Sequence, residues 1–281
     1  MIPKPELRKV ADVFSSSLIE ELANDDFKKM LQLKALLGFD GSEKIEVRHL
    51  LQYAFNHLTK YYKSEYVYKC ILFKKVILGV HSPNTAAMLS ELRLGSSKVD
   101  AFIVNGIATS YEIKSEYDNL DRLEKQLSDY AAFSDKVYVL GDIKKIDQLV
   151  SNIPSQFGIK VLTKRGTMST VRTSSNFYPE FSVEKVASLL TAPELKDIVR
   201  PCLTSIDDVP NTMVYKACKE VLTTFSAHEL KRLTLSRLKC RGIENNRLLA
   251  KLPYELVGRV SHAKLSVKKQ NKFLNALTAT V

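Results

Sequence analysis

The chain has 281 residues, of which 45% are hydrophobic and 26% are charged, with 12 Tyr and 12 Phe among them. This balance is typical of a globular protein with a sizeable core, and it excludes disorder as the main state. No run approaches the roughly 20 apolar residues that span a bilayer, and no apolar signal segment follows the first residues. The four cysteines form no CxxC pair, so we expect neither a zinc site nor a disulfide framework, and a reducing cytoplasm fits best.

Positive charge is concentrated at the C-terminal end of the chain. The formal net charge is +11. Residues 213–281 hold fourteen Lys and Arg against four Asp and Glu, a net charge of +10, which leaves +1 for residues 1–212. A basic segment attracts polyanions, and nucleic acid is the commonest of these in a cell. The alternative is a solvated helical surface whose lysines serve solubility.

The first region of the chain, residues 1–75, is predicted to be helical. Apolar residues recur there at helical spacing on both sides of a break at residues 38–41. Four tyrosines near its end fit a packing role better than a stacking platform for bases: Tyr61, Tyr62, Tyr66 and Tyr68.

The second region, residues 76–175, alternates between strand and helix patterns. Strand composition marks residues 98–104 and 109–114, and Asn105-Gly106 between them is a strong hairpin signal. The elements predicted next are a helix over 119–133, a strand over 136–140, a helix over 143–150 and strands over 158–162 and 168–172. Strands that alternate with helices favour an α/β layer.

The third region, residues 176–281, returns to helical patterns. Thr191 and Ser226 each have a glutamate three residues later, which is the form of a capping box at a helix start. Gly242 is predicted to end the second of these helices. The predicted fold class is therefore α/β, with a mixed-sheet core over 76–175 between helical N-terminal and basic helical C-terminal regions.

The residues that could carry chemistry lie in the short stretch 91–116. Asp100 is on the first strand of the hairpin, and Glu112 and Lys114 are on the second. Period-2 alternation puts Glu112 and Lys114 on one face, with Ile113 on the other. Two carboxylates on neighbouring strands beside an ammonium group could hold Mg²⁺, which prefers oxygen ligands. The alternative is an ordinary half-exposed hairpin with a surface salt bridge.

The register of this hairpin tests the metal hypothesis. A two-residue turn at Asn105-Gly106 would turn Asp100 away from Glu112. A three-residue loop over 104–106 would place Asp100 opposite Ser110, on the same face as Glu112. The metal hypothesis therefore predicts the longer loop or another one-residue shift, such as a bulge within a strand.

The stretch 91–116, ELRLGSSKVDAFIVNGIATSYEIKSE, resembles the metal-binding core of the PD-(D/E)XK nuclease superfamily, which has the restriction-endonuclease-like fold. Asp100 matches the aspartate of that family, and Glu112-Ile113-Lys114 matches its ExK motif. Val99 stands where the nominal proline would be. More closely, this stretch and the following residues resemble a little-characterised bacterial group of such proteins.

Further residues extend the resemblance on both sides of the motif. Glu91 matches the upstream acid, at the end of a helix begun near Asn84 or the start of a short strand. Gln126 and Tyr130 are similar to the QxxxY on the following helix in the exonuclease-like branch. The resemblance covers about a hundred residues and implies little about either flank.

The resemblance implies metal-assisted hydrolysis of phosphodiester bonds, usually in DNA. Asp100 and Glu112, the Ile113 carbonyl and Glu91 would hold Mg²⁺, or Mn²⁺ in its place, and Lys114 would orient the attacking water and stabilise developing negative charge. Two residues would contact substrate, with a packing role as the alternative for the second: Gln126 and Tyr130.

Three functions follow from these patterns. The first is an active Mg²⁺-dependent nuclease in the cytoplasm that acts on nucleic acid, with no membrane association and with an N-terminal flank that could support a homodimer. The second is a protein on a nuclease scaffold that binds nucleic acid through its basic C-terminal helices without cutting it. The third is a structural or interaction protein in which the Glu-x-Lys spacing is a coincidence.

Overall fold

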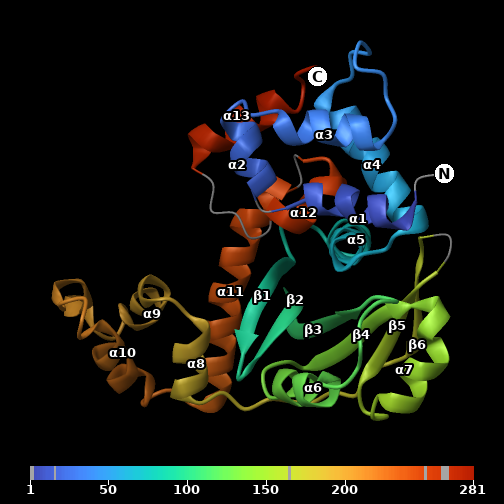
Figure 1. Cartoon of the computed structure of the whole chain (residues 1–281). Coiled ribbons are helices and arrows are strands. Elements are labelled where there is room, and N and C mark those ends of the chain that lie inside the picture. The colour runs from blue at the N-terminus through green and yellow to red at the C-terminus, as the bar shows by residue number, and fades with distance from the viewer. Residues whose placement is uncertain (1–2, 16, 164–165, 250–251, 261–265) are drawn as a thin grey trace.

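A six-stranded mixed sheet forms the centre of the structure (Figure 1). The computed structural model describes residues 3–15, 17–163, 166–249, 252–260 and 266–281. The strands lie in chain order across the sheet: β1 (Ala87–Leu94), β2 (Ser97–Asn105), β3 (Ile107–Lys114), β4 (Lys136–Asp142), β5 (Gly158–Leu162) and β6 (Met168–Arg172). The β3–β4 and β4–β5 pairs are parallel and the others are antiparallel. The predicted mixed α/β fold with helical flanks is confirmed.

Helices surround this sheet on both sides and at the β1 edge (Figure 1). Those before the sheet are α1 (Lys4–Val13), α2 (Ser17–Ala23), α3 (Lys28–Leu36), α4 (Val47–Tyr61), α5 (Glu65–Leu72) and the π-helical turn η1 (Phe73–Leu78). Within the sheet region lie α6 (Leu123–Ala131), the 3-10 turn η2 (Ile143–Lys145) and α7 (Ile146–Asn152). After it come α8 (Val183–Leu189), α9 (Ala192–Val199), the 3-10 turn η3 (Thr204–Asp208), α10 (Val214–Leu222), α11 (Ala227–Leu249), α12 (Tyr254–Val260) and α13 (Val267–Ala276).

Each face of the sheet closes its own apolar core. Tyr111 and Ile113 of β3 are buried against the N-terminal helices, in a core that also holds residues of α12 and α13. Val137 and Val139 of β4 are buried on the other face, in a core shared with Leu127 of α6 and the helices after the sheet. Successive side chains of a strand point to opposite faces, as the period-2 pattern of the sequence predicted, so β3 can contribute to both layers.

The end of the chain returns to its beginning. Helix α12 packs against α5, and α13 packs against α2. Ile45 and Val281 exchange two backbone hydrogen bonds, of 3.1 and 2.9 Å. Residues from α12 onward therefore extend the core of the N-terminal helices. The predicted division into three successive regions, 1–75, 76–175 and 176–281, does not describe this contact between the two ends of the chain. The boundaries at 75 and 175 stay a prediction.

Three local predictions were wrong, each for a physical reason. No helix begins near Asn84, because the chain forms turns there and then enters β1 directly. The helix expected over 119–133 begins only at Leu123. Gly242 does not end α11, which continues to Leu249. A Cβ at Gly242 would lie 2.5 Å from the Ala87 Cβ, so this glycine permits the close approach of α11 to β1. Among the described residues, no helix has the length and hydropathy needed to cross a bilayer.

Candidate active site

Three carboxylates lie in one row across β1, β2 and β3. The β2–β3 pairing runs from Asn105 opposite Ile107 to Ala101 opposite Tyr111, which brings Asp100 level with Glu112. Gly106 alone separates the innermost pair, with a φ of 75°. Neither loop considered from the sequence is present, but the register differs from the two-residue turn by the one residue that the metal hypothesis required. The regular pairing ends at Ala101 and Tyr111, and the two side chains then meet different helices: Asp100 lies against Lys69 of α5, whereas Glu112 lies against Tyr130 of α6.

Glu91 completes the row from β1. It lies between the paired residues Ser90 and Leu92, whose partners are Ala101 and Val99, so it is level with Asp100. It is therefore in the middle of a strand, not at the end of a helix or the start of a strand as predicted. Its φ is 56°, in the left-handed region where a non-glycine residue costs about 1–3 kcal/mol.

The alternation of buried residues breaks in both β1 and β2 at the site. In β1, Leu89 and Leu92 belong to the same apolar core although three positions separate them. In β2, Val99 and Phe102 likewise share that core. Strict alternation would send such pairs to opposite faces. The break in alternation falls at Glu91 and Asp100, which releases these two acids from the apolar faces and lets them meet α5.

Helix α5 adds Lys69 and Glu65 to this row, and neither residue was predicted from the sequence. The Lys69 ammonium lies 2.6 Å from a Glu65 oxygen and 3.8 Å from Asp100 Oδ1, and it also donates to Glu91. Lys69 is only 5% exposed. The sequence offered one signal for this pair: Glu65 and Lys69 are four residues apart, and Lys69 lies in an otherwise apolar helix. The signal was not used, because the tyrosines of this segment were interpreted as packing residues.

The acids of this row and Lys69 shift one another's pKa values. Burial raises the pKa of Asp100 well above its usual value, and the charges of Glu112 and Glu65 raise it further. Burial alone would lower the pKa of Lys69, but its carboxylate neighbours outweigh burial and raise it. Burial likewise opposes ionisation of Glu91, yet hydrogen bonds and charge from Lys69 and Lys98 hold its pKa below the usual value. Asp100 is therefore the carboxyl whose charge is least compensated.

A second set of contacts holds Glu112 from the side of α6. Lys114 Nζ lies 2.9 Å from Glu112 Oε1 and 3.1 Å from the side-chain oxygen of Gln126. The Tyr130 hydroxyl is 2.7 Å from Glu112 Oε2 and 2.9 Å from the Lys98 carbonyl, and the tyrosine is fully buried. Burial and the Glu112 charge raise the pKa of Tyr130, so its hydroxyl stays a donor. Both oxygens of Glu112 thus have partners, and its orientation is fixed.

The structure brings most of the predicted residues together, in two linked groups. Glu91 and Asp100 join Glu65 around Lys69, whereas Glu112 is turned toward Lys114 and α6. Ile113 connects the groups, because its backbone N–H donates to Asp100 Oδ2 over 2.7 Å. Substrate contact by Gln126 and Tyr130 stays a prediction. Both touch the Glu112–Lys114 pair, and the burial of Tyr130 fits the packing alternative.

The donor set around Lys69 fits a divalent cation. Glu65, Glu91 and Asp100 each place an oxygen within 4.8 Å of the other two. Carboxylate oxygens are the ligands that Mg²⁺ and Mn²⁺ use most in proteins, usually with water and substrate completing the shell. Burial and the charges of Glu112 and Glu65 raise the pKa of Asp100, and a bound cation would act in the opposite direction. A bound cation and the Lys69 ammonium would compete for the same oxygens.

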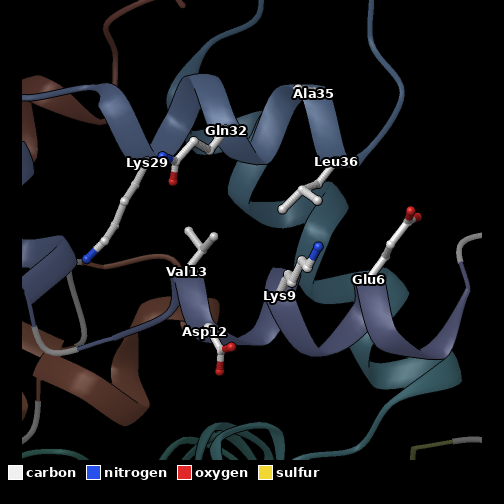
Figure 2. Close-up of a pocket in the computed structure, with 8 residues that line it drawn as sticks. All are labelled: Glu6, Lys9, Asp12, Val13, Lys29, Gln32, Ala35 and Leu36. Atoms are coloured by element: carbon white, nitrogen blue, oxygen red, sulfur yellow. The ribbon is translucent and has the colours of Figure 1, made fainter.

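Two pockets border the N-terminal helices. One of about 300 Å³ reaches the site, since Glu65 and Lys69 line it together with Arg8, Tyr62 and Ser64. A larger pocket of about 660 Å³ lies between α1 and α3, where Figure 2 shows side chains of both helices along it. None of the site residues lines the larger pocket, so volume alone does not locate the chemistry.

Comparison with known proteins identifies the family. The family model described as "Bacteriophage P4 protein cII" matches residues 58–263, which include every residue of the site just described. The chain belongs to this family. Comparison with curated proteins gave no match. A solved structure described as "SPO1766 protein of unknown function from Silicibacter pomeroyi" is 15% identical, with coverage of 54% of this chain and 80% of that chain and a TM-score of 0.28.

Proposed function

We propose that this member of the P4 cII family is a metal-dependent nuclease of the PD-(D/E)XK type that hydrolyses phosphodiester bonds in DNA. The observation that carries the proposal is the alignment of Glu91, Asp100 and Glu112 across three strands, with Lys114 beside Glu112. A location in the cytoplasm stays a prediction. A homodimer stays a prediction.

The metal-binding residues in this proposal are Asp100 with Glu91 and Glu65, and Glu112 is the adjacent acid. Bound Mg²⁺ would supply a water of lowered pKa and positive charge at the scissile phosphate. The Ile113 N–H holds one oxygen of Asp100, which leaves the other oxygen directed toward Lys69 and the remaining acids. The Ile113 carbonyl, predicted as a ligand, stays a prediction.

The remaining residues position one another. Tyr130 donates to Glu112 and fixes its carboxylate, and Glu112 in turn holds the Lys114 ammonium. Gln126 accepts a second hydrogen bond from Lys114, so the amine has a defined direction. An ammonium held in this way can donate to the attacking water and to a phosphate oxygen as negative charge develops.

One observation favours the alternative function, a protein that binds nucleic acid without cutting it. Lys69 already contacts three carboxylates of the site, and a permanent ammonium there would satisfy these acids without any metal. The two functions differ in a single consequence. A nuclease must exchange or share the Lys69 contacts with a metal, whereas a binding protein keeps them.

Cleavage of a labelled duplex tests the proposed function. Wild type, Asp100→Asn and Lys114→Ala are compared in Mg²⁺, Mn²⁺ and EDTA, with Glu116→Gln as the matched control, because Glu116 is a nearby acid paired to the exposed Lys144. We expect metal-dependent cleavage by wild type and the control, and loss of about a hundredfold or more in the two site variants. Equal binding with no cleavage in any sample would favour the alternative function.

A further inference from the structure

A groove with basic walls lies at the opposite end of the β2–β3 hairpin from the acids. It has a volume of about 370 Å³ and is formed between the hairpin turn and the first half of α11. The turn contributes Gly106 and the half-exposed Ile107. From α11 come His228, Lys231, Arg232, Leu235, Ser236 and Lys239. Asp100 and Gly106 are six residues apart on an extended strand, or about 20 Å, so the groove is separate from the carboxylate row.

The basic side chains of this groove share one face of α11. His228, Lys231 and Arg232 are spaced by three and four residues, and Lys239 follows two turns later, so they point the same way. Lys231 is paired with Asp135, whose other oxygen accepts from the Ala108 N–H at 2.9 Å. This pair fastens α11 to the end of the hairpin and places the remaining cations beside the turn.

The cations of α11 divide into two classes. On its other side, Arg237 pairs with Asp197 at 3.1 Å and Arg241 with Glu194, so these charges are neutralised within the protein. Arg232 and Lys239 make no ion pair with any side chain that the structure describes. Glu229, three residues before Arg232, accepts from Ser226 in a capping box, and its charge also attracts Arg232 and His228. The groove nonetheless presents Arg232 and Lys239 outside any ion pair with the described side chains.

We propose that this groove binds the phosphodiester backbone of nucleic acid and holds the substrate of the same protein at a distance from the acids. From His228 to Lys239 the helix rises about 16 Å, which corresponds to about five phosphates of one strand of a duplex. Two unpaired cations, a histidine and the Ser236 hydroxyl along that length suit a chain of phosphates better than a single small anion. That the bound nucleic acid is a substrate rests on the proposed function. Binding in the groove does not itself require cleavage.

Binding in EDTA tests the groove without any catalysis. A fluorescent duplex of about 20 base pairs, two helical turns, is titrated with the full-length protein while anisotropy is followed over a range of salt. The groove variant is Arg232→Gln with Lys239→Gln. The matched control is Lys216→Gln with Lys219→Gln on α10, which removes the same charge from exposed positions of the same basic region. DNA and RNA duplexes are titrated in parallel, since both carry this backbone.

The expected result is a loss on the order of tenfold in affinity near 0.1 M salt for the groove variant alone. The slope of log K against log salt should become shallower by about 1.8, or 0.9 for each lost phosphate contact. The same loss on DNA or on RNA supports the proposal and identifies the substrate. Affinity and slope that match the control variant overturn it, as does a wild type that binds neither duplex but binds anionic vesicles through the same residues. Normal groove binding without cleavage in Mg²⁺ would instead remove the proposed function and leave this inference intact.

Discussion

Replacement of Lys69 by methionine is the sharpest perturbation that the site offers. Methionine keeps most of the buried volume of the lysine stem but removes its charge from among Glu65, Glu91 and Asp100. Without a divalent cation, the three acids lose the ammonium that, among the described residues, is the one that all of them contact. With a divalent cation, the same change removes the competitor for their oxygens.

The size of the effect follows from the geometry. At 3.8 Å and an effective dielectric constant of about 20, the Lys69–Asp100 attraction alone is about 4 kcal/mol, and desolvation of the buried groups offsets much of it in the intact protein. Removal of one partner of a buried ion pair leaves the other without compensation, which typically costs about 3–5 kcal/mol. For a chain of this length we expect the Tm of Lys69→Met to fall by about 10 °C in EDTA.

Thermal unfolding with and without Mg²⁺ measures both consequences. A site filled at a hundred times its Kd stabilises the fold by about 2.7 kcal/mol, so Mg²⁺ should recover about half or more of the loss in Lys69→Met and should shift wild type less. Lys98→Met is the control, since Lys98 is 56% exposed and also contacts Glu91. A Lys69→Met variant that is as stable as wild type, or that responds to Mg²⁺ no more than wild type, would refute the reasoning.

The other predictions concern stability. Glu91→Gly should be more stable than Glu91→Ala by about 1 kcal/mol in urea unfolding, because both lose the carboxylate and only alanine retains a Cβ at a φ of 56°; a more stable alanine variant would show that no strain is stored there. Gly242→Ala should destabilise by about 1–3 kcal/mol despite the higher helix propensity of alanine, because its Cβ would meet Ala87; an unchanged urea midpoint would contradict this packing. Burial would raise the pKa of Glu194, but hydrogen bonds from Arg241 and from Thr191, at the N-cap of α9, hold this pKa below the usual value of 4.5. Its contribution is therefore complete above pH 4.5 and is lost as pH falls through the lowered pKa. The stability difference between wild type and Glu194→Gln should accordingly shrink only in acid, and a difference that grows in acid would oppose this sign.

Local patterns were sufficient for β2 to β6 but not for β1, where a helix begun near Asn84 was expected. Alternating residues in 98–104 and 109–114 predicted β2 and β3, and the strands predicted over 158–162 and 168–172 match β5 and β6. The metal hypothesis required a one-residue shift from the two-residue turn, and the pairing around Gly106 has that shift, although Asp100 and Glu112 then meet different helices. These features depend on residues close together in the chain, which is the reason that sequence patterns report them.

Features that depend on distant residues were not predictable from one sequence. Lys69 and Asp100 are 31 residues apart, and only the packing of α5 on β3 brings them together. Glu91 has a left-handed φ, a conformation that no local rule assigns to that residue type. Gly242 was interpreted by its usual role at a helix end, whereas the approach of α11 to Ala87 decides its role here.

The most direct test of the central claim is the anomalous diffraction of crystals soaked in Mn²⁺. The proposed function predicts one or two peaks bounded by Asp100 and its neighbouring carboxylates, with the Lys69 ammonium moved away from at least one of them. Crystals at saturating Mn²⁺ with no peak beside Asp100, and with Lys69 still in contact with all three acids, would contradict the assignment of a metal-dependent nuclease.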